Sequence, residues 1–573
     1  MVKPTKDRLP NKRMRKWVEL FWLISIIASV VLLNVLGAYV FGRFDLTEEK
    51  RYTLSETTRN MLEELDDVVF VRVYLEGDLP AEFRELRDAV KETLDEFRAY
   101  AGDNLQYEFI NPGASPVESE RMQVYAELSK QGLQYTTVRI QSGDKHAEQI
   151  IFPGAIVAFR ERETPVQLLK NQMGVSEQEL IAISIQQLEY ELLSAIKKVS
   201  ETEKKSIAFI DGYGSLEPIE VADVEQALSE FYDVEHIKIN SRLDALKLTD
   251  AIIIARPDSA FSEKDKFIID QFIMRGGKVL WMIDAVFARM DSLQKSNITM
   301  GLVLDHNLDD QLFKYGVRLN PNLIMDLEAL PIPIVTGYIG NRPRQEMFTW
   351  YYSPLLQPID TNPITKNLDR IKTEFVSSID PIEVEGVKFT PLLVSSDKSR
   401  TVNAPTRISF NILREPPRYE LFNQGPFVAA ALLEGSFQSV FTNRLPQKLI
   451  SDEGINFKEK SLIPTRMIVV ADGDIIRNPV RRSENRYFSL GYDKWTNRVY
   501  GNKEFILNCI NYLFDDAGLI NVRNKEFKIR LLDQTRIATE RYYWQILNTV
   551  LPIVIVIGVG LALNAVRRKK YVY

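Results

Sequence analysis

The sequence predicts an α/β protein that is anchored in a membrane by one helix near each end. Three observations lead to this prediction: two long uncharged segments close to the termini, alternating strand-like and helix-like segments between them, and a length of 573 residues. A chain of that length exceeds what one hydrophobic core supports, so we expect several domains between the two anchors.

The two uncharged segments, Leu20–Phe41 and Trp544–Val566, are long enough to cross a bilayer. A helix rises about 1.5 Å per residue, and the hydrocarbon core is about 30 Å thick. Basic residues flank the first segment on its N-terminal side and the second on its C-terminal side. The positive-inside rule then predicts two cytoplasmic tails and a periplasmic body. A cleaved signal peptide is the alternative for the first segment, but its apolar run is longer than a signal core.

Composition narrows the class of protein. The basic tails leave a net acidic body, which argues against nucleic acid as a partner. The single cysteine, Cys509, excludes an intrachain disulfide and fits a bacterial envelope protein better than an extracellular animal protein. One cysteine and three histidines also make a zinc site improbable. We predict no metal ion and no cofactor.

Residues 42–200 are predicted to form a thioredoxin-like α/β domain. Ser55 is a plausible cap for the first helix, and strands over Val68–Leu75 and Leu105–Ile110 flank a helix over Ala81–Tyr100. Further strands over Tyr135–Gln141, Glu148–Ile151 and Ala155–Arg160 follow a helix near Val117–Gln131. The Cys-x-x-Cys pair of disulfide-exchange enzymes is missing, so that chemistry is excluded.

Residues 201–330 show the pattern of a parallel, doubly wound sheet. Short β-rich runs alternate with two helices, of which the second is capped by Ser262 with Asp265. The four runs are Ser206–Ile210, Val234–Ile239, Ala251–Ala255 and Lys278–Ile283. A fifth run, Met467–Val470, is expected to rejoin this sheet from far downstream.

The remaining boundaries follow from composition. We assign 1–16 to a cytoplasmic basic tail, 17–41 to the first transmembrane helix, 331–465 to a β-rich, proline-rich region and 466–523 to the return into the α/β domain. We assign 524–543 to a juxtamembrane helix, 544–566 to the second transmembrane helix and 567–573 to a second cytoplasmic basic tail.

Polar residues follow four strands of the predicted parallel sheet. Ligands bind beyond the carboxyl ends of such strands, so these residues form a candidate ligand cleft. They are Asp211, Tyr213, Arg256, Asp258, Asp284, Asp472 and Asp474. The alternative is that they only build the turns that every α/β sheet requires.

A search for catalytic motifs finds none. Gly212-Tyr-Gly214 follows a strand, but Glu217 stands where a dinucleotide-binding turn needs its third glycine. The sequence has no P-loop, no His-Glu-x-x-His and no Gly-x-Ser-x-Gly. Asp472 and Asp474 are two acids in a turn, a spacing more typical of a turn than of a metal site. Cys509 is predicted to pack in a helix core.

Several segments resemble a known family. Asp45-Leu-Thr-Glu-Glu-Lys-Arg-Tyr-Thr-Leu-Ser55, directly after the first anchor, is similar to the entry segment of auxiliary subunits of uncharacterised ABC transport systems. More narrowly, the chain resembles the GldG family of gliding-motility-associated ABC transporter proteins of Bacteroidetes. The other supporting segments are 207–214, 267–278, 470–474, 502–513, 518–520 and 528–533.

The resemblance implies a non-catalytic accessory or substrate-binding subunit in the bacterial inner membrane. Its implied partners are an ABC permease and a cytoplasmic ATPase, together with a periplasmic ligand or cargo. It also implies that the central domain is similar to class I glutamine amidotransferases, although no cysteine lies near a strand end to act as their nucleophile. A periplasmic envelope enzyme or ligand-binding protein using the cleft, and a structural scaffold, remain alternatives.

Overall fold

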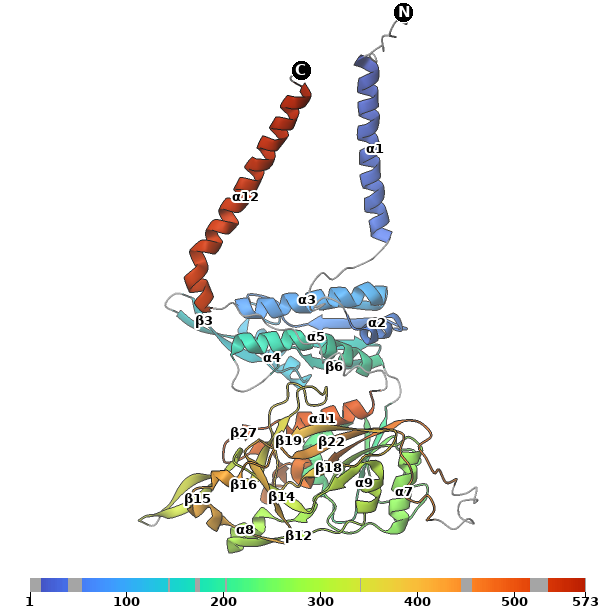
Figure 1. Ribbon diagram of the computed structural model, residues 1–573, viewed down its shortest axis with the longest axis vertical. Helices are drawn as coiled ribbons and strands as arrows, with labels where there is room; N and C mark the ends of the chain where they lie inside the picture. Colours follow the sequence, from blue (N-terminus) through green and yellow to red (C-terminus); the bar gives the residue numbers. More distant parts are fainter. Residues whose placement is uncertain are drawn as a thin grey trace, which may run out of the picture. The chain divides into compact units, whose positions relative to one another are not determined.

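The computed structural model describes residues 12–39, 54–142, 145–170, 176–200, 204–340, 342–444, 456–515 and 534–571. The chain divides into two compact units, Met1–Leu54 and Ser55–Tyr573. The described helices and strands confirm a mixed α/β architecture (Figure 1). The finer domain boundaries remain predictions.

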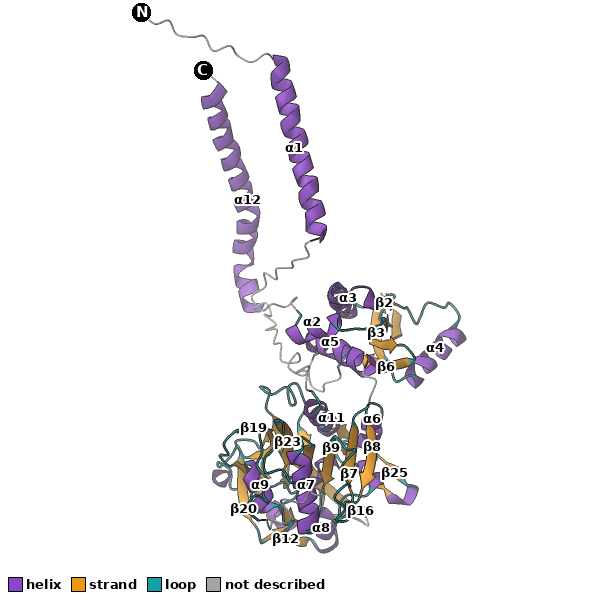
Figure 2. Cartoon of the chain, turned by 90° about the vertical axis from the view of Figure 1, so that its right-hand side faces the viewer, coloured by secondary structure: helices purple, strands orange, loops and turns teal. Residues whose placement is uncertain are grey.

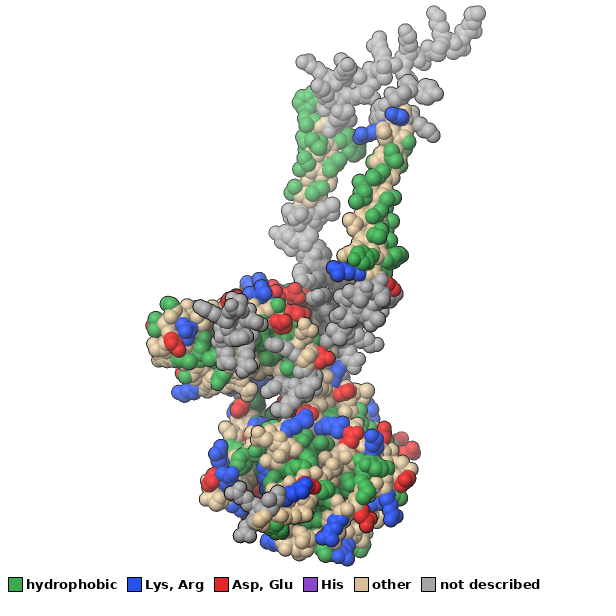
Figure 3. Space-filling view, turned by 90° about the vertical axis from the view of Figure 1, so that its left-hand side faces the viewer, with side chains coloured by type: hydrophobic (Ala, Val, Ile, Leu, Met, Phe, Trp, Pro, Cys, Tyr) green, Lys and Arg blue, Asp and Glu red, His purple; other side chains and the backbone are tan. Residues whose placement is uncertain are grey.

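Long helices lie near both ends of the chain. In the first unit, helix α1 runs over Lys12–Tyr39, and the apolar helix within its described side chains covers Leu20–Leu32. In the second unit, α12 runs over Gln534–Tyr571, and its segment Glu540–Arg568 is long and apolar enough to cross a membrane. Figure 3 shows the hydrophobic side chains that cover the described parts of these helices. The second membrane span is thus supported among the described residues, and the first remains a prediction.

The N-terminal part of the second unit contains a four-stranded sheet in the order β2-β1-β5-β6. Strands β1 and β2 are parallel, while β5 and β6 are antiparallel additions. Ser55 caps α2 as predicted, because its hydroxyl accepts from the Thr58 amide at 3.0 Å. The elements are α2 (Glu56–Glu63), β1 (Val69–Val73), α3 (Ala81–Ala101), β2 (Leu105–Phe109), α4 (Glu118–Lys130), β3 (Thr136–Ser142), β4 (Lys145–Ile151), β5 (Gly154–Phe159), β6 (Arg162–Gln167) and α5 (Glu177–Ser200). Strand β6 was not predicted.

A large mixed sheet follows, in the order β15-β16-β19-β22-β23-β10-β9-β7-β8. Strands β7, β8, β9, β10 and β23 are parallel, and β23 lies beside β10 as the sequence predicts. The first elements are β7 (Ser206–Ile210), α6 (Pro218–Ser229), β8 (Asp233–Ile237), β9 (Ala251–Ala255), α7 (Glu263–Met274), β10 (Lys278–Met282), β11 (Val286–Phe287), α8 (Met290–Ser296), β12 (Ile298–Val303) and α9 (Asp309–Tyr315).

The region 331–465 extends this sheet with antiparallel strands, so the sheet is mixed rather than wholly parallel. We expected a β-rich region here but did not predict that its strands pair into the same sheet as the parallel strands. From α9 to residue 515, the remaining described strands and α-helix are β13 (Val317–Leu319), β14 (Asn322–Asp326), β15 (Ala329–Ile339), β16 (Arg342–Pro358), β17 (Ile371–Lys372), β18 (Ile379–Pro381), β19 (Val387–Val394), β20 (Ser399–Asn403), β21 (Thr406–Ser409), β22 (Val428–Gly435), β23 (Thr465–Val470), β24 (Val480–Arg481), β25 (Arg486–Tyr487), β26 (Tyr492–Asp493), β27 (Arg498–Val499) and α11 (Asn502–Leu513).

Helices cover both faces of the sheet (Figure 2). Side chains alternate between the faces of a strand, so neighbouring residues enter different cores. Ile253 packs with α6 and α11, whereas Ile252 and Ile254 pack with α7 and α9. Cys509 is buried in the first of these cores, as predicted. The predicted helix start at Asn524 lies outside the described residues.

Candidate functional site

The carboxyl ends of β7, β9, β10 and β23 lie along one edge of the sheet, because these strands are parallel neighbours. The predicted cleft residues follow these strand ends directly. The structure sorts them into three groups: a carboxylate cluster after β10 and β23, a turn contact between β7 and β9, and a contact of Asp211 with His236 in the outer strand β8.

The carboxylate cluster is organised by the turn after β23. Asp472 is fully buried, and its two oxygens accept hydrogen bonds from the backbone amides of Asp474 at 2.8 Å and Glu374 at 3.0 Å. Asp284, at the end of β10, accepts from the amide of Gly473 at 2.6 Å. These bonds tie the ends of two parallel strands to the loop that follows β17.

Two arginines face the carboxylate of Asp474. Nη1 of Arg256 lies 3.0 Å from Oδ1 of Asp474, and Nη1 of Arg477 lies 3.3 Å from the same oxygen. Arg477 also pairs with the buried Glu220 at 3.1 Å. Arg256 has a φ of 51°, a left-handed conformation that costs a residue with a Cβ energy. The fold therefore holds Arg256 in a conformation that only the surrounding contacts can maintain.

Burial keeps protons on part of this cluster near neutral pH. The pKa of Asp284 is raised to about 7, first by burial and then by the charge of Asp474. The pKa of Glu374 is raised to about 7 by the same two causes in the same order. Burial and the charges of Asp284 and Asp474 also raise the pKa of Asp472 well above its usual range. Carboxyls that titrate near pH 7 can exchange protons, a property common at functional sites and also found in structural networks.

The turn after β7 contacts the turn after β9. Tyr213 adopts a φ of 53°, and its carbonyl accepts from the amide of Asp258 at 2.8 Å. Its ring stacks on Phe261 with centroids 4.0 Å apart, and its hydroxyl donates to Asp265. Nη2 of Arg289 lies 3.4 Å from the carboxylate of Asp258. Tyr213 therefore holds the two turns together through its backbone and its side chain.

Asp211 takes part in a different contact. Its carboxylate lies 2.9 Å from Nδ1 of His236, while Nε2 of that ring lies 3.6 Å from Glu225. The imidazole stacks on Phe209 with centroids 5.2 Å apart. The structure thus places Asp211 at the outer strand, with His236 rather than with the carboxylate cluster.

The sequence did not predict that Glu374, Arg477 and Glu220 also lie at this edge of the sheet. Glu374 follows a two-residue strand, and Arg477 follows a short 3-10 turn, so neither lies at a position that periodicity marks. Within the described ranges, no group of three or more His, Cys, Asp or Glu side chains is arranged to hold a metal ion.

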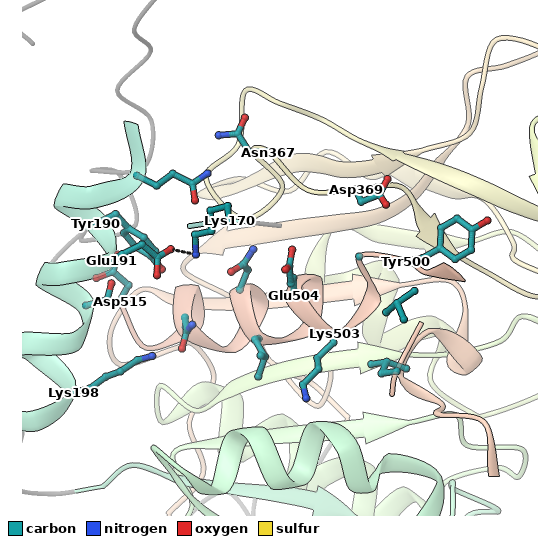
Figure 4. Close-up of a pocket in the computed structure, with 18 of the residues that line it drawn as sticks. Lys170, Tyr190, Glu191, Lys198, Asn367, Asp369, Tyr500, Lys503, Glu504 and Asp515 are labelled. Carbon is teal, nitrogen blue, oxygen red and sulfur yellow. Dashed lines mark ion pairs between the residues drawn. The ribbon is translucent and has the colours of Figure 1, made fainter. Parts of the chain in front are cut away.

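A separate pocket of about 700 Å³ is lined from α5 and α11, among other segments. Figure 4 shows Lys170 paired with Glu191, at 2.6 Å, and Lys503 and Glu504 on α11. Five lysines and four acidic residues line this pocket. Charges of both signs favour no single class of ligand, so the pocket alone assigns no function.

Comparisons with known proteins give a family and distant relatives. A domain of unknown function matches residues 48–158. An uncharacterized protein of Borreliella burgdorferi is 21% identical over 394 residues, covering 66% of this chain and 70% of the relative. A solved structure titled mmIFT52 N-terminal domain matches with a TM-score of 0.31 and 11% identity, covering 54% of this chain and 97% of the other.

The family match spans residues 204–509, which include the mixed sheet and the strand-end residues described above. The matched family is described as an ABC-type uncharacterized transport system. This range is more than half of the 573-residue chain. The chain therefore belongs to this ABC-type transport system family, and its role is an accessory, transport-related one.

Proposed function

We propose that this protein is a non-catalytic accessory or substrate-binding subunit of an ABC transporter complex in a bacterial inner membrane. The observation that carries the proposal is family membership over 204–509, joined in one chain to the apolar helix Glu540–Arg568. The sequence contains no P-loop, so ATP hydrolysis would come from a separate subunit. An ABC permease and a cytoplasmic ATPase are the proposed partners.

The proposed topology has two crossings, cytoplasmic tails and a periplasmic body. The basic residues that flank the two apolar segments support this orientation. The resemblance to the GldG family leads us to propose that the complex serves gliding motility, or the secretion that supports it. The thioredoxin-like and amidotransferase-like interpretations of the two α/β regions belong to the same proposal.

Topology can be tested on a single introduced cysteine. Lys295 is exposed on α8, and the native Cys509 is fully buried. A membrane-impermeant maleimide should label Lys295→Cys in cells with a permeabilised outer membrane but leave the unsubstituted chain unlabelled. Labelling that requires lysis of the inner membrane would overturn the periplasmic placement.

Partnership can be tested by gentle solubilisation of native membranes and capture through a tag on the C-terminal tail. Mass spectrometry should find an ABC permease and its ATPase in a defined ratio. Recovery of this chain alone, under conditions that preserve other ABC complexes, would contradict the accessory-subunit proposal.

A second candidate function is an envelope enzyme or small-ligand-binding protein that uses the strand-end cluster. The pKa values of Asp284 and Glu374, raised to about 7, favour this alternative because such groups can exchange protons at neutral pH. Asp284→Asn and Glu374→Gln should then abolish function in cells while complex assembly persists. Full function in both variants would exclude a chemical role for these carboxyls.

A further inference from the structure

A second set of strand ends lies in the smaller sheet, where β1 and β2 are parallel neighbours. A pocket of about 380 Å³ opens there, lined from the segments that follow β1 and β2, from α4 and from the end of β4. Small-molecule sites occupy roughly 300–1,000 Å³, and strand carboxyl ends are their usual place in α/β sheets. This volume is therefore sufficient for a small ligand.

Aromatic side chains line the pocket. Phe152 is fully buried, and Tyr125 lies against it with ring centroids 5.4 Å apart and planes inclined by 35°. Tyr74 follows β1 directly and is 8% exposed. The face of an aromatic ring carries negative charge density and attracts cations. Of these three rings, Tyr125 is the least buried, and its face suits a ligand that carries positive charge.

The hydroxyl of Tyr74 gives a second, independent indication of a ligand. Only 8% of this residue is exposed, but its hydroxyl oxygen is open to solvent and makes no hydrogen bond to another described residue. A phenol oxygen can accept a hydrogen bond from a ligand, and burial raises the pKa of Tyr74, which keeps the hydroxyl neutral.

Acidic residues predominate at the rim. Glu76, Asp78 and Glu118 line the pocket, against Arg121 as the one lysine or arginine among its described lining residues. Asp78 and Glu118 are exposed and form no ion pair with a described residue, whereas Arg121 donates to the carbonyl of Ser115 at 3.0 Å. Two carboxylates are therefore available to a cation from solution.

The loop after β1 packs tightly against the loop after β2. Gly77 has a φ of 119°, and a Cβ there would lie 2.8 Å from Nδ2 of Asn111, in the loop after β2. Glu76 accepts from the Gly77 amide at 3.3 Å and pairs with Arg87 at 3.4 Å, so it is partly neutralised. Asp78 and Glu118 are the better test positions.

We propose that this pocket binds a small organic cation that carries a primary ammonium group and an apolar or aromatic body. The ammonium would donate to the Tyr74 hydroxyl and to the carboxylates of Asp78 and Glu118, while the body lies against the half-buried ring of Tyr125. This site is separate from the strand-end cluster of the larger sheet, and it does not depend on the transporter proposal. An amine ligand or the lysine side chain of a peptide would present the same chemistry.

The test uses the full chain in detergent and isothermal titration calorimetry with benzylamine, after subtraction of heats measured with empty micelles. Benzyl alcohol and benzoate are matched neutral and anionic probes. Benzylamine should bind saturably, and at least about tenfold more tightly than either analogue. An amidated lysine peptide, titrated in the same way, distinguishes a peptide ligand from a free amine by its relative affinity.

Variants then assign the binding to this pocket. The double substitution Asp78→Asn with Glu118→Gln should weaken benzylamine binding about tenfold, and Tyr74→Phe should weaken it without changing the preference for a cation. Glu92→Gln, at an exposed position of α3 outside the pocket, is the matched control and should bind normally. Equal binding of all three probes, unchanged binding in the double variant, or no saturation up to about 10 mM would each overturn the proposal.

Discussion

Arg256 and Asp474 lie at the ends of two parallel strands that are separated by β10, and they are joined by an ion pair of 3.0 Å. Their side chains are 12% and 14% exposed. The pair therefore lies largely out of water, next to the raised-pKa carboxyls of Asp284 and Glu374. Arg256 supplies positive charge where several acids lie close together, of which Asp472 is fully buried.

Removing the charge of Arg256 should destabilise the protein strongly. In Arg256→Gln the carboxylate of Asp474 loses its nearer partner and keeps Arg477 at 3.3 Å, so we expect a loss of about 1.5–3 kcal/mol in the free energy of unfolding. Arg289→Gln is the matched control, because its contact with Asp258 is 3.4 Å long and its side chain is 43% exposed. That change should cost at most about 1 kcal/mol. Chemical denaturation of both variants provides the comparison, and equal losses would show that Arg256 has no special role.

Protonation of Asp284 and Glu374 should make the protein more stable as the pH falls from about 7.5 toward about 4.5. Their pKa values are raised to about 7 in the folded chain, above those of an unfolded chain. Between the two values the folded state binds more protons than the unfolded state, so stability decreases as the pH rises through this window. Melting temperatures measured across that range should show the trend.

The double variant Asp284→Asn with Glu374→Gln isolates this contribution. Both amides resemble the protonated carboxyls, and the amide oxygen introduced at position 284 would still accept from the Gly473 amide. The variant should exceed the unsubstituted protein in stability above about pH 7 and show a smaller pH dependence below it. An unchanged slope would mean that other groups set the pH response.

The sequence predicted those parts of the fold that depend on local patterns. Ser262 caps α7 by accepting from the Asp265 amide at 3.1 Å, and β23 joins β10 in register, as apolar runs and capping residues indicate. The antiparallel strands β16, β19 and β22 were not placed in the same sheet. Their pairing is between residues far apart in the chain, and periodicity carries no information on such partners.

The residues of the candidate site were also predictable only where a local pattern marks them. Residues directly after strands, such as Arg256 and Asp284, are marked by the position where the strand ends. Glu374 and Arg477 reach the same edge from loops, and only the folded chain brings them there. The raised pKa values of Asp284 and Glu374 could not be predicted from the sequence either, because they arise from burial and from neighbours that lie far apart in sequence.

Gly473 should tolerate no side chain. A Cβ at this position would lie 2.3 Å from Cγ and 2.8 Å from Cα of Arg256, and the backbone atom cannot move aside cheaply. Gly473→Ala should therefore lower the free energy of unfolding by at least about 1–3 kcal/mol. Gly337→Ala is the matched control, since nothing lies within 4 Å of its Cβ position, and it should change stability by less than about 0.5 kcal/mol. Urea titrations of the two variants decide the point, and equal midpoints would contradict close packing at Gly473.

Tyr213→Phe should separate the two ways in which this residue joins the turns after β7 and β9. The substitution removes the hydrogen bond from the hydroxyl to Asp265 and keeps both the stack on Phe261 and the carbonyl that accepts from Asp258. A hydrogen bond to a charged group contributes about 1.5–3 kcal/mol, so we expect a loss of that size in urea denaturation. Tyr419→Phe, at a side chain that is 66% exposed, should have an effect below about 0.5 kcal/mol. If both variants matched the unsubstituted protein, the turns would be held by the backbone bonds and the aromatic stack alone.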